Sequence, residues 1–209
     1  MGDVYHLFQT MYRQMGPQGW WPAESKSEIV LGAILVQNTN WQNAAKSLQN
    51  LRLLTQLHPE KIAALTQADI IEAIRPSGFY TNKGRAIFEF FAWFQEFDFS
   101  FDRIKKVYGT ELRKQLLSLR GIGEETADVL LLYVFDEKVF IADKYAQRLF
   151  TYLGWSTATN YRQLHQQVDL SEFTLAEAQE FHGLIDEFGK IFLKSPTTWQ
   201  QSFLYEINH

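Results

Sequence analysis

Leu119-Arg120-Gly121-Ile122-Gly123 is the stretch around which the rest of the chain is organised. Apolar residues recur at helical spacing before it, in 111–118, and after it, in 124–135, so two helices joined by a tight turn are expected. The two glycines permit backbone torsions that other residues resist. Backbone amides in such a turn, followed by a helix N-terminus, form a site for an anion such as phosphate. The same pattern is also typical of an ordinary helix connection, and this alternative stays open.

Composition narrows the class of protein. With 209 residues, 46% of them hydrophobic, the chain can bury one sizeable core or two small ones and is not disordered. No apolar run is long enough to span a bilayer, and the first residues do not show the pattern of a signal peptide. These two observations predict a cytoplasmic protein with no membrane partner. The absence of cysteine excludes disulfides, thiol nucleophiles and a thiolate-held iron–sulfur cluster. The net charge of −4 argues mildly against a protein that coats nucleic acid, but says little about one local face.

The pattern along the chain predicts an all-α fold, because no segment alternates convincingly with period two. Helices are expected over 3–15, 27–36, 41–57, 59–65, 68–74, 86–97, 99–107, 111–118, 124–135, 144–153, 160–168 and 174–194. Asp143, twenty residues after Gly123, directly precedes one of them and is suited to cap it. Trp20 and Trp21 lie in a loop, where they either cover a core or line a pocket for a flat ligand.

Several motifs together carry a family resemblance. The 119–123 turn, Thr126-Ala127 and Ile141-Ala142-Asp143 resemble the helix-hairpin-helix DNA glycosylases, the superfamily of endonuclease III. Trp20-Trp21-Pro22, the L-x-Q-N-T segment at 35–39 and the F-H-G-x-I-x-E-F-x-K segment at 181–190 are more similar to the 3-methyladenine DNA glycosylase III subgroup. The resemblance implies a six-helix lobe at 27–136, a second lobe built from 1–26 plus 137–209, and a DNA-binding cleft between them. It also implies a monomer whose partner is double-stranded DNA with a damaged base.

The same resemblance assigns roles to individual residues. It makes Asp143 the catalytic carboxylate. The base pocket that it implies consists of Trp20, Trp21, Pro22, Trp41 and Lys190. The DNA contacts that it implies come from Gln37, Asn38, Leu119, Arg120, Gly121, Ile122, Gly123 and Lys144. Gln37 would fill the space left by an extruded nucleotide, although capping of the flanking helices is the plainer alternative. Lys190 has the alternative of an ordinary surface lysine, and His182 of a structural histidine. Lys83 and Arg85 are candidates for contacts with phosphate.

The chemistry expected of such a site is hydrolysis of the N-glycosidic bond. An enzyme that acts on a base must extrude it, and stacking on aromatic rings offsets the cost. A cationic alkylated purine leaves readily, so a carboxylate that stabilises the positive sugar and orients water suffices. Bifunctional relatives place a nucleophilic lysine two residues after the second hairpin glycine, where this chain has Glu125. The expected enzyme is therefore a monofunctional DNA N-glycosylase without AP lyase activity.

The two glutamates at 124 and 125 would repel phosphate, and a monovalent cation held by the hairpin backbone would compensate. No other cofactor, and no metal held by side chains, is expected. Three alternatives remain at this point. An endonuclease III-like glycosylase/lyase for damaged pyrimidines is disfavoured by Glu125. A silent helix-hairpin-helix DNA-binding module is disfavoured by the presence of Asp143, and a purely structural helical protein requires every motif match to be accidental.

Overall fold

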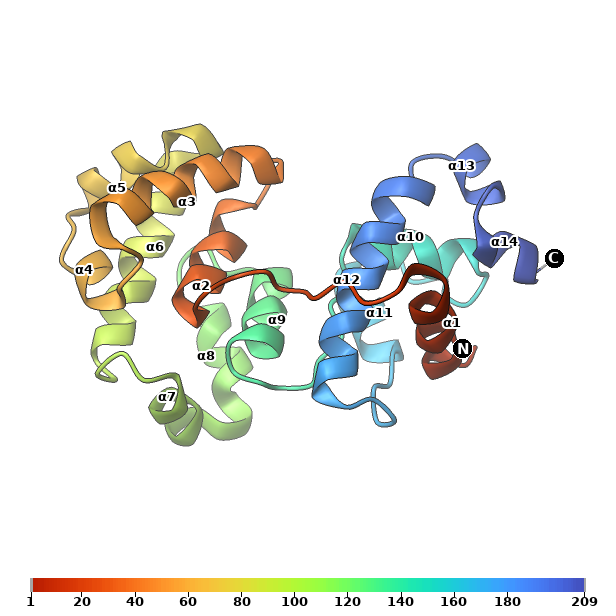
Figure 1. Ribbon diagram of the computed structural model, residues 1–209. Coiled ribbons are helices and arrows are strands. Elements are labelled where there is room, and N and C mark those ends of the chain that lie inside the picture. Colours follow the sequence, from red (N-terminus) through yellow and green to blue (C-terminus); the bar gives the residue numbers. More distant parts are fainter. Residues whose placement is uncertain (1, 209) are drawn as a thin grey trace. The chain divides into compact units, whose positions relative to one another are not determined.

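The computed structural model describes residues 2–208, and throughout this range regular secondary structure is helical. The all-α prediction is confirmed. No helix in the described part of the chain combines the length and the apolar character needed to cross a membrane. The described chain forms two compact units (Figure 1). Unit 1 combines the chain up to Pro22 with the chain from Asp136 onward, and unit 2 is the continuous segment Ala23–Phe135. The outermost ends of the expected second lobe, residues 1 and 209, lie outside the described residues.

Unit 2 is built around α2 (Lys26–Leu35), whose residues from Ser27 onward are all buried. It packs against α3 (Trp41–Thr55), α6 (Tyr80–Gln95) and α9 (Glu124–Tyr133). The remaining helices of the unit are α4 (Pro59–Ala63), α5 (Gln67–Ala73), η1 (Arg75–Ser77), α7 (Phe101–Tyr108), η2 (Gly109–Glu111) and α8 (Leu112–Ser118). A helix that is apolar on all sides has no solvent face, so the other helices must enclose it. This arrangement fixes both ends of α2, one of which leads into Gln37.

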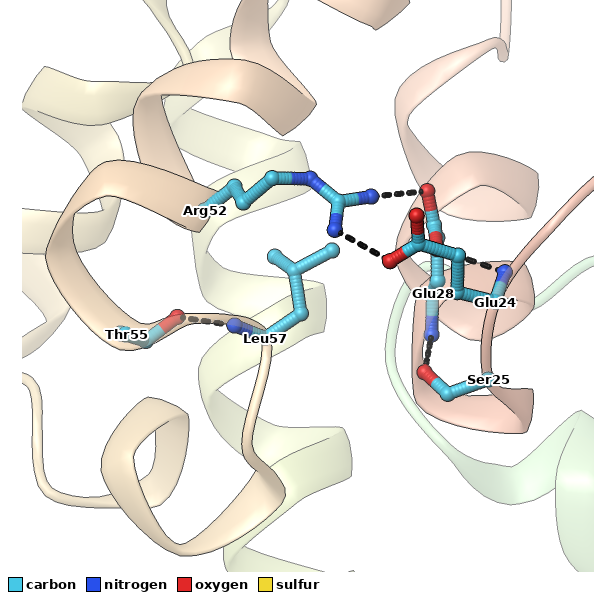
Figure 2. Close-up of polar contacts among 6 residues, drawn as sticks. All are labelled: Glu24, Ser25, Glu28, Arg52, Thr55 and Leu57. Atoms are coloured by element: carbon cyan, nitrogen blue, oxygen red, sulfur yellow. Dashed lines mark hydrogen bonds and ion pairs between the residues drawn. The ribbon is translucent and has the colours of Figure 1, made fainter.

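The first turn of α2 is anchored to α3 through Arg52 (Figure 2). The Arg52 guanidinium donates to Glu24 Oε2 at 2.8 Å and to Glu28 Oε1 at 2.6 Å, and these hydrogen bonds raise its pKa above the ordinary value. Ser25 caps the helix by accepting from the Glu28 amide at 3.2 Å. The nearly buried Glu28 carboxylate also accepts from the Glu24 amide at 2.9 Å. These bonds satisfy donors at the helix start and tie α2 to α3.

The C-terminal end of α2 is closed by a buried lysine. Lys83 is only 3% exposed, and its ammonium donates to the carbonyls of Leu35 at 2.8 Å and Ser77 at 2.7 Å. Burial lowers the pKa of Lys83. The prediction that Lys83 contacts phosphate is therefore wrong, because its ammonium is buried inside the unit and donates to carbonyls at the ends of two helices. Arg85 is half-exposed and pairs with Glu89 at 2.8 Å, one helical turn away.

Unit 1 is built around α12 (Leu175–Phe192), which contacts α1 (Val4–Met15), α10 (Lys144–Tyr152) and α13 (Pro196–Gln200) (Figure 1). The unit also contains α11 (Tyr161–Gln167) and α14 (Phe203–Asn208). Side chains from both ends of the chain form one aromatic core, in which Phe8 of α1 contacts Phe173 and Phe181 at ring-centre distances of 5.3 and 6.0 Å. The N-terminal segment is thereby held on α12, and the loop that follows α1 runs along the same helix.

Candidate active site

Asp143 caps the N-terminus of α10, as its place in the sequence predicts. The preceding residues Phe140, Ile141 and Ala142 are buried and fix the chain as it enters the helix. The Asp143 carboxylate accepts a hydrogen bond from the Ala146 amide at 2.8 Å and is 9% exposed. A cap of this kind holds the side chain in one orientation, and the positive helix N-terminus favours the ionised form. The geometry therefore presents an oriented carboxylate.

The loop that carries the two tryptophans is fastened to α12 by Glu180. This carboxylate accepts from the amide of Gln18 and, at 3.1 Å, from the amide of Gly19. Both of its oxygens are used on the backbone of a segment that has no regular structure of its own. Trp20 follows directly, so Glu180 determines where that side chain begins.

Trp20 lies against Gly183 of α12. A Cβ atom added to Gly183 would be 2.5 Å from Trp20 Cδ1 and 2.7 Å from Cγ, so only glycine allows this approach. Trp21 meets Trp20 edge-on with ring centres 5.3 Å apart, and His182 does so at 5.8 Å. Burial lowers the pKa of His182 to about 4, and the positive charge of Lys190 acts in the same direction. At neutral pH the imidazole is therefore uncharged.

Lys190 lies over the Trp20 ring, with Nζ 5.3 Å from its centre. The same ammonium is 2.5 Å from Asp186 Oδ2 and 2.8 Å from Glu187 Oε1. Burial alone would lower the pKa of Lys190, but these two ion pairs outweigh it and raise the pKa. Lys190 is thus a charged group held on an aromatic face rather than a lysine that extends freely into solvent.

The helix α12 holds the carboxylate and the aromatic residues in one unit. Tyr145 of α10 packs on Gly189, where an added Cβ would be 2.4 Å from the tyrosine ring, while Trp20 packs on Gly183. Asp143 is two residues before Tyr145, at the start of the helix that Gly189 positions. Unit 1 therefore combines an oriented carboxylate with two tryptophans that pack edge to face. Such a set can hold a flat base and stabilise positive charge on an attached sugar.

The hairpin belongs to unit 2 and joins α8 to α9. Gly121 has φ +76° and an added Cβ would be 2.7 Å from Cβ of Ala86, so both its backbone torsion and its packing require glycine. Gly123 is the N-cap residue of α9 and supplies no side chain to bond the first amides. The two helices are locked together by Arg113, which donates to both oxygens of the fully buried Asp128 at 2.7 and 2.9 Å. Arg113 therefore serves the motif's internal structure.

Gln37 is tied to this hairpin. Its Nε2 donates to the Gly121 carbonyl at 3.1 Å and to Thr126 Oγ1 at 3.0 Å. Capping of the next helix falls to Asn40, which accepts from the Asn43 amide at 2.9 Å. Asn38, beside Gln37, is exposed and has a positive φ of 51°. Gln37, Asn38 and the hairpin thus form one surface region of unit 2.

Phe79 belongs to the same region and was not singled out from the sequence. It is 65% exposed and has φ +46°, a conformation that costs a bulky residue free energy. Lys83 binds the carbonyls of both Leu35 and Ser77, so the turn carrying Phe79 lies beside the turn carrying Gln37. The signal in the sequence was an aromatic residue directly after Gly78, in a segment that interrupts two helices. A loop aromatic of this kind either packs on a core or faces a ligand, and the structure shows that Phe79 is exposed.

The predicted pocket residues divide between the two units. Unit 1 brings together Trp20, Trp21 and Lys190, with Pro22 exposed at the end of the same loop. Trp41, 44% exposed, belongs to unit 2, at the first turn of α3. Lys144 is exposed on α10, with Nζ 5.0 Å from the ring centre of Tyr145. Within residues 2–208, no group of three or more histidine or acidic side chains is arranged to hold a metal ion.

Comparison with known proteins gives a consistent set of relatives. A Methanocaldococcus jannaschii protein with the provisional name of DNA repair glycosylase is 33% identical, over 91% of this chain and 89% of its own. The crystal structure of H. pylori 3-methyladenine DNA glycosylase bound to 1,N6-ethenoadenine has a TM-score of 0.75 and 28% identity, over 90% of this chain and 98% of that one. A non-covalent endonuclease III–DNA complex has a TM-score of 0.74 at 18% identity, over 94% and 90%, and so shares the fold.

The family model described as HhH-GPD superfamily base excision DNA repair protein matches residues 31–172, which include the hairpin and Asp143. This match covers most of the chain, and the identified motifs lie where the structure has a helix–turn–helix and a capped carboxylate. The chain belongs to the HhH-GPD superfamily and is a DNA glycosylase of base excision repair.

Proposed function

We propose that this chain hydrolyses the N-glycosidic bond of alkylated purines such as 3-methyladenine and leaves the DNA strand intact. The observation that carries the proposal is the Asp143 carboxylate, oriented by the Ala146 amide in the unit that holds the Trp20–Trp21 pair. The similarity to a 3-methyladenine glycosylase over almost the whole chain supports the same substrate class. In this proposal Gln37, Asn38 and the hairpin of unit 2 contact the duplex, and Gln37 fills the place of the extruded nucleotide.

The reaction follows from the charges involved. In a cationic alkylpurine nucleotide, the bond between C1′ and the purine nitrogen breaks and its electron pair neutralises the base. Positive charge develops on the sugar, where the ionised Asp143 stabilises it. Water adds to C1′ and loses a proton, which leaves an abasic site. The proposed reaction needs no cofactor, and the proposed active species is a monomer.

The absence of a hairpin lysine supports the monofunctional mode. A lyase forms a Schiff base through an amine, and Glu125 stands where the bifunctional relatives are expected to have that amine. Lys144 is the alternative amine closest in sequence to Asp143. Neighbouring residues of a helix point about 100° apart, so the two side chains do not share a direction. Lys144 is therefore the position to test if strand cleavage occurs.

The test measures base release from randomly methylated duplex DNA by the native chain and by Asp143→Asn. Asparagine can still accept from the Ala146 amide, so this variant keeps the cap while removing the charge. We expect released 3-methyladenine from the native chain, a loss of at least about a hundredfold in the variant, and an intact strand until alkali is added. Lys144→Ala is the comparison variant, in which we expect base release to continue at saturating DNA even where the loss of a DNA contact weakens binding of the duplex.

Other outcomes would redirect the assignment. Strand scission without alkali, lost in Lys144→Ala, would show a lyase. Tight duplex binding without base release from either methylated or oxidised DNA would show a silent binding module. Equal rates for the native chain and Asp143→Asn would remove Asp143 from the chemistry.

A further inference from the structure

The stripe of α12 that faces Trp20 carries charge between its two contact points. Gly183 and Lys190 both contact this tryptophan and are seven residues, or two turns, apart on the helix. Asp186 and Glu187 lie between them, and each forms an ion pair with Lys190. Both carboxylates are therefore in direct contact with the Lys190 ammonium, which lies over the Trp20 ring.

Of the two acids, Asp186 is the more deeply placed. Its side chain is 16% exposed, against 36% for Glu187. Burial raises the pKa of Asp186, while the ion pair with Lys190 and the charge of Lys144 oppose that increase. A carboxylate in such a position is costly unless cations surround it. Asp186 thus interacts with both Lys190 and Lys144, the residue that follows the proposed catalytic carboxylate.

A lysine on the ring face creates a difficulty for a cationic base. Two positive charges near one aromatic face repel each other, and the partly buried surroundings strengthen the repulsion. Asp186 and Glu187 offset this effect, because they place two carboxylates against the single ammonium of Lys190. Without one of them, the excess negative charge of this group would disappear.

We infer that Asp186 is a positioning and specificity-determining residue, which holds Lys190 on Trp20 and gives the base site its preference for cationic over neutral purines. This inference rests on the proposed glycosylase function. It concerns the selection of the base, whereas Asp143 acts on the sugar.

The test compares two substrates in the full chain. One is 3-methyladenine in methylated duplex DNA, which is cationic as the nucleotide, and the other is 1,N6-ethenoadenine in a defined duplex, which is neutral. For Asp186→Asn we expect the ratio of the two release rates to fall about tenfold, because the side chain keeps its shape and loses its charge. Where release of ethenoadenine is too slow to time, the dissociation constants of the two duplexes replace the rates.

Two further variants separate charge from structure. Glu187→Gln removes the more exposed partner and should reduce the ratio less. The double variant Asp186→Asn with Lys190→Met removes one negative and one positive charge, so it should return the ratio to near that of the native chain. If Asp186 had only a structural role, removal of Lys190 as well would not restore the ratio. Thermal melting of each variant checks that it is folded.

The inference is overturned if the native chain discriminates between the two bases and Asp186→Asn leaves the ratio unchanged, or if the double variant does not restore it. Failure of the native chain to release or bind either base instead overturns the proposed function, and this inference with it.

Discussion

At the scale of single residues, His182 makes the stability of unit 1 depend on pH. Its pKa is about 4 in the folded chain, because burial excludes the charged form, against an ordinary value of about 6.5. The stabilisation from the neutral imidazole is complete above pH 6.5. It is lost as pH falls from 6.5 towards 4, since only the unfolded chain takes up a proton there. We expect this residue to cost the native chain about 2–3 kcal/mol across that interval.

The measurement is the free energy of unfolding in urea between pH 4 and pH 7.5, for the native chain and His182→Gln. The variant should show a shallower decline over that interval, whatever its stability at neutral pH. His165, which also lies in unit 1 and bonds the Phe140 carbonyl at 2.7 Å, provides the matched substitution His165→Gln. An identical pH dependence in the native chain and His182→Gln would contradict the assigned pKa.

Two charged residues show how far single positions could be interpreted from the sequence. The capping role of Asp143 depends on its own helix, so local sequence was sufficient to predict it. Lys83 was expected to contact phosphate, yet its ammonium is buried against carbonyls from two distant turns. No local pattern distinguishes such a lysine from one that faces phosphate, because the difference lies in how α2, η1 and α6 pack.

At the scale of elements, α12 positions the site through its two glycines. Gly183→Ala would place a methyl group 2.5–2.9 Å from the near end of the Trp20 side chain, which must then move. We expect base release to fall by about tenfold or more while unit 1 stays folded, because Trp20 is only partly buried and misplacement of a stacking group weakens the site. Steady-state base release, together with thermal melting, measures both effects.

Gly189→Ala is the matched substitution on the same helix. Its added methyl group would meet the ring of Tyr145 at 2.4 Å and so separate α10 from α12. Overpacking of this kind costs about 1–3 kcal/mol, so this variant should lose stability as well as activity. Equal rates of base release for Gly183→Ala and the native chain would show that the close contact of Trp20 with α12 is not needed for activity.

Helix positions were largely predictable from hydrophobic spacing, and the differences have physical causes. The helix expected over 86–97 begins at Tyr80, because Gly84 is no helix break. It allows α5 to approach, with Ile71 Cγ1 2.5 Å from where its Cβ would be. The short helix Pro196–Gln200 was missed, although Ser195 caps it and proline occupies its first turn. The contacts of Trp20 with α12 join segments far apart in the sequence, so hydrophobic spacing could not show them, and only the family resemblance placed Trp20 and Lys190 in one pocket.

At the scale of the whole molecule, the two units differ in how they depend on the N-terminal helix. Phe8 is 5% exposed in the aromatic core of unit 1, so Phe8→Ala removes packing from that unit alone and should cost about 3–5 kcal/mol. In limited proteolysis with rising temperature, we expect cuts in 137–208 before cuts in 23–135. The matched variant Phe90→Ala, in the core of unit 2, should reverse this order. Simultaneous cutting of both units in each variant would show one cooperative body instead.

The discontinuous construction of unit 1 also has a consequence for synthesis on the ribosome. The hydrogen bonds that fasten the tryptophan loop join residues 161 and 162 positions apart, and the Tyr5–Glu177 bond spans 172 positions. The N-terminal segment therefore emerges first and waits, with its apolar side chains uncovered, until α12 has been translated. Unit 2 is continuous and can fold during that interval, since domains form as their segments emerge. The nascent chain thus completes its hairpin before Trp20 is held on α12, so under the proposed function the base site is the last part of the enzyme to form.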